Sequence, residues 1–262
     1  MQGQTLSDTR PRILTDAQLK SFERDGYLVL RALFSDVEVT QIRDWTEELA
    51  GYPEVPGKYM MYFEQSLTEP GKRLLSRVEN FVPYHEGFAA LVTGEKMLGT
   101  VSELFSEPAT LFKDKINFKL PGADGFKAHQ DVQAGWDSYA SLHITAMVAI
   151  DRTTATNGSL ELVAGEHKRG LLGHKWEPLT DADTAGMEFI AVDAMPGDAV
   201  FFDSFAPHRS GPNRSREPRR ILYITYNRLS EGDHRVQYYI DKRQNYPPDC
   251  EREQGKTYEY KV

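Results

Sequence analysis

Residues 198–229 read DAVFFDSFAPHRSGPNRSREPRRILYITYNRL, with two short apolar segments on either side of a polar stretch rich in Gly, Pro and Arg. Short runs of β-branched and aromatic residues bounded by turn residues are typical of strands. The same pattern begins at about residue 110 and recurs in ATLFKDKINFKL, LHITAMVAI, GSLELVAG and EFIAV. The sequence therefore predicts a core of several short, mainly antiparallel strands.

The chain before this core has helical features. Capping-box patterns at residues 15–18 and 35–38 predict two helix starts. An apolar stripe at helical spacing predicts a third helix over residues 86–106. Residues 52–85 contain GKYMMYFEQ, which could be a strand, among Gly and Pro residues that indicate long irregular connections. We expect this region to form a loop-rich substrate lid.

Many strands with helices gathered at the start favour a mainly β fold with flanking α-helices, an antiparallel double sheet braced by helices. A chain of 262 residues with 40% hydrophobic residues can form one such domain. We expect an N-terminal helical part and lid over about 1–110, a strand core over about 111–230 and a C-terminal extension over 231–262.

Composition narrows the function class. The formal net charge of −8 and a pI near 5.4 argue against nucleic-acid binding, which needs clustered Lys and Arg. The chain has one cysteine, its first residues MQGQTLSDTRPRIL lack the apolar run of a signal peptide, and no apolar stretch approaches the ~20 residues that span a bilayer. We therefore expect a cytoplasmic protein with small-molecule partners and no membrane contact.

His129 and Asp131 stand one residue apart in FKAHQDVQAGW. In an extended backbone such side chains lie on one face, so both could reach one metal ion. His208 is a candidate third ligand because it follows a predicted strand at the rim of the sheet. Two imidazoles and one carboxylate with open positions suit non-haem Fe(II) in oxygenases. An ordinary hydrogen-bonded polar pair is the alternative at this point.

An open iron site can take an α-keto acid and dioxygen, and the far carboxylate of the keto acid needs a cation. A guanidinium gives a bidentate match. Arg219 lies eleven positions after His208, and its neighbour Arg220 must point to the opposite face of the same strand. We expect Arg219 to face the site, although a solvated turn is the alternative for this arginine-rich segment.

The ordered segments DGYLVLRALFS, HQD, NGSLELVAGEHKRG, MPGDAVFFDSFAPHRSGPN and PRRILYITYN resemble the phytanoyl-CoA dioxygenase family of Fe(II)/2-oxoglutarate oxygenases. The resemblance implies a cupin-like double-stranded β-helix, or jelly roll, with Fe(II) held by the two histidines and Asp131. It implies that Arg219 binds 2-oxoglutarate and that Gln130 and Ser210 lie around it, with Asn117 a further candidate contact. The retained aspartate implies hydroxylation.

The substrate is the least defined part. In LFKDKINFK, strict alternation places Lys113, Lys115, Asn117 and Lys119 on one strand face, which either faces water or forms an anion-binding strip near His129. Aromatic rings could enclose an organic cation, although such residues more often belong to the core. The residues named as substrate contacts are Lys115, Tyr62, Trp136 and Lys127.

Parts of the chain are similar to the branch of the family that hydroxylates 2-aminoethylphosphonate or its N-methylated analogues at the carbon next to phosphorus. We therefore expect a compact zwitterionic substrate of this kind. The alternatives are a hydroxylase of ectoine or an amino acid, an acyl-CoA hydroxylase, and a noncatalytic binding protein of the same fold.

Overall fold

Two antiparallel sheets form the centre of the computed structural model, which describes residues 12–258. The prediction that residues 1–14 lack a signal peptide concerns a stretch of which residues 1–11 lie outside the described residues. The larger sheet runs in the order β1 (Tyr27–Leu30), β9 (Ala199–Asp203), β6 (His143–Ala149), β11 (Arg219–Arg228), β4 (Ala109–Lys119), β3 (Arg73–Glu79) and β2 (Met60–Gln65). The smaller sheet runs in the order β5 (Phe126–His129), β10 (His208–Ser210), β7 (Leu160–Leu162) and β8 (Ile190–Val192).

Strand β6 shows why these segments are almost continuously apolar. Every residue of His143–Ala149 is buried. Ile144, Ala146 and Val148 pack in the cluster that includes the helices, whereas Met147 and Ala149 pack with residues of the smaller sheet. A strand covered on both faces loses the alternation of polar and apolar residues that marks a half-exposed strand.

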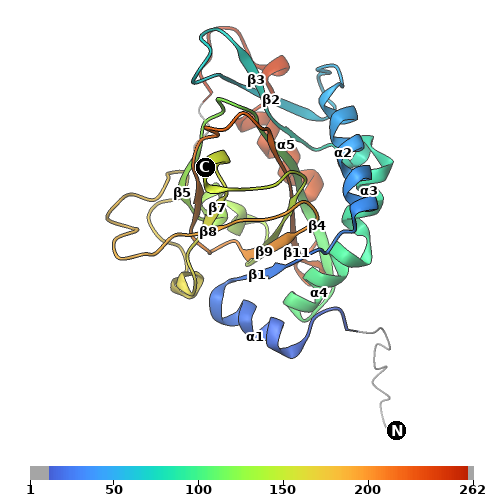
Figure 1. Ribbon diagram of the computed structural model, residues 1–262, viewed down its shortest axis with the longest axis vertical. Coiled ribbons are helices and arrows are strands. Elements are labelled where there is room, and N and C mark those ends of the chain that lie inside the picture. The colour runs from blue at the N-terminus through green and yellow to red at the C-terminus, as the bar shows by residue number, and fades with distance from the viewer. Residues whose placement is uncertain (1–11, 259–262) are drawn as a thin grey trace.

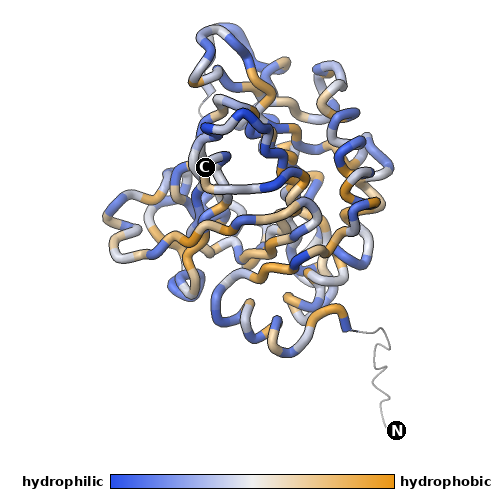
Figure 2. Tube along the Cα trace, viewed as in Figure 1, coloured by the Kyte–Doolittle hydropathy of each residue, from blue (hydrophilic) through white to orange (hydrophobic). Residues whose placement is uncertain are grey.

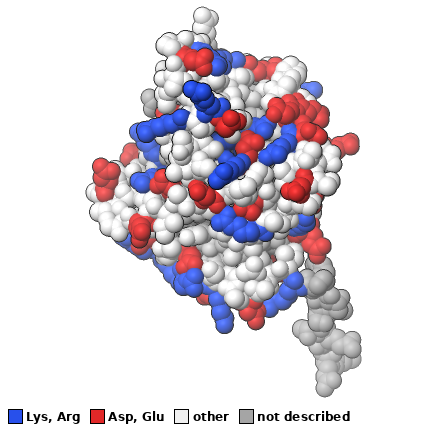
Figure 3. Space-filling model, viewed as in Figure 1, with Lys and Arg blue, Asp and Glu red and all other residues white. Residues whose placement is uncertain are grey.

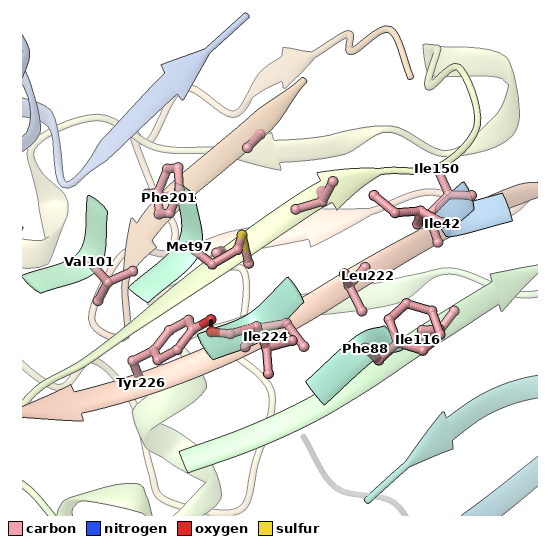
Figure 4. Packing of buried hydrophobic residues seen from close by; sticks show 14 of the residues in the cluster. Ile42, Phe88, Met97, Val101, Ile116, Ile150, Phe201, Leu222, Ile224 and Tyr226 are labelled. Atoms are coloured by element: carbon pink, nitrogen blue, oxygen red, sulfur yellow. Dashed lines mark hydrogen bonds between the residues drawn. The ribbon is translucent and has the colours of Figure 1, made fainter. Parts of the chain in front are cut away.

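Four helices pack in the hydrophobic cluster on one face of the larger sheet, namely α1 (Asp16–Asp25), α2 (Asp36–Ala50), α3 (Glu86–Thr93) and α4 (Thr100–Phe105). The last helix, α5 (Arg235–Asn245), packs in a separate cluster with Tyr62, Phe112 and Trp136. Figure 1 shows α2, α3 and α4 together along one side of this sheet. In Figure 4, Ile42 of α2 and Phe88 of α3 lie against Leu222 and Ile116 of strands β11 and β4. Both predicted capping boxes are present, at Thr15 and Ser35.

The structure adds detail to three local predictions. Within residues 52–85 the possible strand is present as β2, which forms a hairpin with β3 that extends the larger sheet, joined by a largely hydrophilic loop (Figure 2), and the flanking residues are irregular. The expected helix over 86–106 is interrupted, since Gly94 ends α3 and a π-helical turn over Glu95–Gly99 precedes α4. The C-terminal extension contains α5, which packs beside β4.

The predicted fold class is confirmed by this arrangement of two facing antiparallel sheets with flanking helices. One end of the space between the sheets holds apolar side chains, including Met147, Leu162 and Phe202. The other end holds the histidines and lysines described below. Acidic and basic side chains are mixed over the face in Figure 3. Within residues 12–258, no helix combines the length and the apolar character that crossing a bilayer requires.

Candidate active site

His129, Asp131 and His208 converge at the end of the smaller sheet. His129 is the last residue of β5 and His208 the first of β10, and the two are directly opposite in the antiparallel pair. Asp131 begins the 3-10 turn Asp131–Ala134 that follows β5. Its Oδ1 lies 4.0 Å from His129 Nε2 and 3.8 Å from His208 Nε2. One ligand atom from each residue lies within 4.8 Å of the others, a separation that one metal ion can bridge.

Backbone carbonyls hold both imidazoles in one tautomer. His129 Nδ1 lies 2.8 Å from the carbonyl oxygen of Lys127, and His208 Nδ1 lies 3.0 Å from that of Ala206. A carbonyl oxygen only accepts, so Nδ1–H donates in both rings and the Nε2 lone pairs point toward Asp131. Histidines that bind metals are oriented by this kind of bond on the other ring nitrogen.

Thr145 orients the carboxylate. Its hydroxyl donates to Asp131 Oδ2 at 3.0 Å, and it lies 2.9 Å from the hydroxyl of Thr225 on the adjacent strand. The second oxygen, Oδ1, is the one that faces the two imidazoles. The strands β6 and β11 therefore hold one oxygen of Asp131 in place and leave the other for a metal ion.

The charge states of the cluster also suit a metal. Burial, together with the adjacent His208, lowers the pKa of His129 to about 3, and burial lowers the pKa of His208. Burial opposes the charge of Asp131, but His208 and Lys115 outweigh it and lower its pKa. Two neutral imidazoles and a carboxylate at neutral pH are the donor set of non-haem Fe(II) sites. The residues present therefore fit Fe(II).

Arg219 lies on the same inner strand face as residues lining the site. It begins β11, is 1% exposed, and has two buried guanidinium nitrogens, Nε and Nη2, without a hydrogen-bond partner among residues 12–258. The buried Asn117 Oδ1 likewise has no partner there. Arg220 points to the opposite face and pairs with Asp151 and Glu47, as the alternation predicts. Buried donors left in this state fit an anionic ligand such as the carboxylate of an α-keto acid.

A pocket of about 640 Å³ opens beside the metal cluster. It shares His129, Asn117 and Phe126 with a smaller inner cavity that contains the cluster itself. Lys115 and Trp136 line the inner cavity, whereas Tyr62 and Lys127 line the outer pocket. The lysines of β4 therefore line the space between the sheets and do not face bulk water, and their role in binding an anion stays a prediction.

The inner cations are held by a buried carboxylate. Glu79 at the end of β3 is fully buried and forms ion pairs with Arg77 at 3.1 Å and with Lys242 of α5 at 2.8 Å. Burial opposes the charge of Glu79, but Lys113 and Lys242 outweigh it and lower its pKa. Lys115 forms no hydrogen bond or ion pair among the described residues, and its ammonium lies 4.8 Å from the centre of the Tyr223 ring. Burial and the nearby Lys113 lower the pKa of Lys115 to about 7.

A family model described as phytanoyl-CoA dioxygenase matches residues 22–221, which include the three clustered ligands and Arg219. The chain belongs to the phytanoyl-CoA dioxygenase family. This membership, together with the cluster, confirms the predicted enzyme class, an Fe(II)/2-oxoglutarate-dependent dioxygenase.

Two relatives and one solved structure are similar to this chain. A 2-aminoethylphosphonate dioxygenase from the uncultured bacterium HF130_AEPn_1 is 42% identical over 93% of each chain. A methylphosphonate hydroxylase from Gimesia maris is 41% identical over 89% of this chain and 88% of its own. The crystal structure of EctD from S. alaskensis with 2-oxoglutarate and 5-hydroxyectoine has a TM-score of 0.73 at 22% identity, covering 85% of this chain and 79% of its own. This last likeness confirms the fold.

Gln130 lies elsewhere than the sequence predicts. Its amide nitrogen donates to the carbonyl oxygens of Gly170 and Phe205, and its Oε1 accepts from the backbone of Leu172. All of its polar atoms are thus used to hold neighbouring loops, and it lines neither cavity. The expected contact between Gln130 and the cosubstrate has no support in this geometry, because the residue between two same-face ligands points to the opposite side.

Three other predicted site residues, Ser210, Lys127 and Tyr62, line the cavities and also contact other parts of the chain. Ser210 lines the inner cavity, where its hydroxyl accepts from Lys119 Nζ at 2.8 Å. Lys127 is exposed at the rim, and its carbonyl is the one that orients His129. Tyr62 donates its hydroxyl to the carbonyl oxygen of Tyr246 at 2.9 Å. Both Tyr62 and Lys127 therefore have structural contacts of their own.

Sequence reasoning missed Thr145, Glu79, Lys242 and Tyr223 as parts of the site. Tyr223 could have been found, because it lies four positions after Arg219 and so shares its strand face. Glu79 and Lys242 carry no comparable signal, since they meet only through the packing of α5 against the sheet.

Proposed function

We propose that this dioxygenase hydroxylates a phosphonate at the carbon next to phosphorus. The observation that carries the proposal is the half-buried side chain of Lys115, which lines the cavity that contains the metal cluster. Both relatives reported above are named for phosphonate substrates. An anion bound at Lys115 would lie in the cavity that the three candidate ligands also line.

The surroundings of Lys115 favour an anion. Lys113 and Arg77 both act on it as like charges, and Asp131 and Glu79 act as opposite charges. Asp131 would serve as a metal ligand, and Glu79 pairs with Arg77 and Lys242. A phosphonate oxygen would add a charge-assisted hydrogen bond to the Lys115 ammonium, which otherwise makes none among the described residues.

Each part of the chain then has a defined task. Fe(II), held by His129, Asp131 and His208, supplies with 2-oxoglutarate and dioxygen the oxidising power needed to hydroxylate a C–H bond. Arg219 binds the distal carboxylate of 2-oxoglutarate, supported by Asn117 and Ser210. Lys115 holds the phosphonate, and Trp136 closes the apolar side of the cavity. Correct placement of the target carbon contributes more to the rate than any protein acid or base.

A substrate panel tests the proposal. The protein is incubated with Fe(II), 2-oxoglutarate, ascorbate and air, and with methylphosphonate, 2-aminoethylphosphonate or ectoine. We expect succinate release and a new phosphorus NMR resonance of an α-hydroxylated product with at least one phosphonate. Turnover of ectoine with unchanged phosphorus spectra would overturn the proposal in favour of the ectoine alternative.

We further propose that the described residues act as one dioxygenase domain and that the enzyme works in the cytoplasm. Helices and larger-sheet strands share one continuous hydrophobic cluster, which supports the first statement. The single cysteine, Cys250, is exposed and unpaired, as expected in a reducing compartment.

A further inference from the structure

We propose that Lys119 binds 2-oxoglutarate together with Arg219, so that two buried cations hold the distal carboxylate of the cosubstrate. The inference deepens the proposed function, because it rests on the contact proposed there between Arg219 and that carboxylate. It does not depend on which compound is hydroxylated. A site of this kind selects α-keto acids that carry a second carboxylate over those that do not.

Lys119 and Arg219 are direct neighbours across two paired strands. Lys119 ends β4 and Arg219 begins β11, and the two residues are opposite each other in the antiparallel register. Side chains that are directly opposite in such a pair lie on the same face of the sheet, with their Cβ atoms about 5 Å apart. Lys119 is 3% exposed and Arg219 is 1% exposed. Two cationic side chains therefore lie side by side in the interior.

The partners of these two cations are neutral oxygens. The Lys119 ammonium donates to the hydroxyl of Ser210 at 2.8 Å and to the carbonyl oxygen of Gly211 at 2.6 Å. Arg219 hydrogen-bonds the hydroxyl of Tyr223, and its Nε and Nη2 have no partner among residues 12–258. Buried charges are normally paired with an opposite charge, so this pair of cations fits an anionic ligand.

The protein's own carboxylates do not fill this role. Glu64 and Asp124 act on Lys119 as opposite charges, but neither forms an ion pair with it within the described part of the chain. Burial, followed by the like charge of Arg219, lowers the pKa of Lys119 to about 6. A carboxylate beside both cations would favour the charged form of Lys119 and would bond the N–H groups that Arg219 leaves unused.

Lys119 lies where the two cavities of the site meet. It lines the outer pocket of about 640 Å³, and its acceptor Ser210 lines the inner cavity that contains the metal cluster. Asn117, two residues before it on the same strand face, lines both cavities. So does Phe126, whose ring centre lies 5.4 Å from the ammonium. The ammonium therefore borders the space that is open to a cosubstrate bound at the metal.

A glycine keeps the place of the Lys119 side chain open. Gly158 has a φ of 79°, in the left-handed region. A Cβ at this position would overlap the carbonyl oxygen of Gly211 and would lie 3.2 Å from Cδ of Lys119. That carbonyl is one of the two acceptors that hold the ammonium. The backbone therefore fixes where the ammonium lies, which reduces the cost of ordering it when a ligand binds.

The test compares two cosubstrates of similar shape and different charge. They are 2-oxoglutarate and 5-methyl-2-oxohexanoate, in which an uncharged isopropyl group replaces the distal carboxylate. Anaerobic titration of the Fe(II)-loaded enzyme, followed by the visible charge-transfer absorption of the keto-acid complex, gives a dissociation constant for each. We expect Lys119→Met to lower the preference for 2-oxoglutarate by at least about tenfold, the effect of one charged hydrogen bond. Lys127→Met, at the exposed rim of the outer pocket, should change it by less than about twofold.

The outcomes separate the role of Lys119 from that of Arg219. Arg219→Met is measured in parallel, and a loss of preference in this variant alone would overturn the role of Lys119 while the proposed function stands. If neither variant loses the preference, the proposed contact of Arg219 fails as well. An unaltered enzyme that binds both keto acids equally well would have the same meaning.

A purely structural role of Lys119 has its own signature. Lys119→Met would then weaken both keto acids by the same factor, and the unchanged preference would overturn the inference. Lys119→Gln is the second variant, because it keeps a polar group beside Ser210 but removes the charge, and it should show the same loss of preference as Lys119→Met. Each preference is a ratio measured on one protein sample, so a partly unfolded fraction does not alter it.

Discussion

The metal end and the substrate end of this site are built in different ways. At the metal end, His129 and His208 are neighbours across two short strands, and backbone carbonyls set both rings. At the substrate end, side chains from β2, β3, β4 and α5 meet, and Glu79 joins Arg77 to Lys242. The pairing of two strands positions the metal ligands, whereas the packing of several elements against one another positions the side chains at the substrate end. A shared chemistry can therefore stay constant while the substrate contacts vary.

The largest expected effect is the loss of activity when a candidate metal ligand is removed. His208→Ala should lower succinate formation on the order of a thousandfold or more, because it removes one of three iron ligands. Iron content and succinate release measure this loss. His174→Ala is the matched control, since His174 is an exposed histidine outside both cavities. Equal activity of the two variants would refute the assigned ligand set.

The next effect concerns the cosubstrate. Arg219→Met should raise the KM for 2-oxoglutarate by about a hundredfold, because the variant loses a bidentate charged contact. The KM for the phosphonate should stay nearly constant. Arg220→Met lies next to it on the same strand and pairs outward with Asp151. That control should weaken thermal stability with little change in the KM for 2-oxoglutarate, and the reverse pattern would contradict the assignment.

In contrast to Arg219→Met, Lys115→Met should affect the phosphonate and not 2-oxoglutarate. We expect kcat/KM for the phosphonate to fall about tenfold to a hundredfold, with an unchanged KM for 2-oxoglutarate, because a buried charged contact to the substrate is lost. Steady-state kinetics with each substrate varied in turn provide the measurement. Lys127→Met, at the exposed rim, should cost about twofold. A change confined to the KM for 2-oxoglutarate would mean that Lys115 serves the metal end.

The sequence predicts the metal end of this site better than the substrate end. The spacing of His129 and Asp131 and the alternation of Arg219 with Arg220 are local features, and the structure has the expected geometry at both. His208 is distant in sequence and is predicted from its place at the end of a strand. The prediction for Gln130 differs from the structure because the residue between His129 and Asp131 points away from them, toward the backbone groups that it bonds. The Glu79–Lys242 pair carries no sequence signal, because no sequence period links residues so far apart.

A smaller effect concerns pH. Burial and Lys113 lower the pKa of Lys115 to about 7, with Arg77 acting in the same direction and Asp131 and Glu79 opposing it. Protonated Lys115 is present below this pH and is lost as the pH rises through it, so phosphonate binding should weaken by up to about tenfold per pH unit above 7. Lys115→Arg keeps its charge and should flatten the profile. The ratio of parent to variant kcat/KM between pH 6 and 9 cancels the ionisation of the substrate.

The smallest expected effect concerns Thr145, which supports the candidate metal ligand Asp131. Thr145→Val removes the hydroxyl that orients Asp131 and should weaken iron binding by about tenfold. An iron titration of the two proteins measures the change. Thr110→Val, on the partly buried start of β4, is a control of the same chemistry away from both cavities. An iron affinity equal to that of the parent would show that the carboxylate needs no such support.

The central claim is that the two ends act on one reaction. The most direct measurement is the ratio of succinate to α-hydroxylated phosphonate formed by the unaltered enzyme, followed in one sample by chromatography and phosphorus NMR. The account predicts a ratio close to one and succinate formation that depends on the phosphonate. Succinate formed at the same rate with and without phosphonate, and no hydroxylated product, would contradict it.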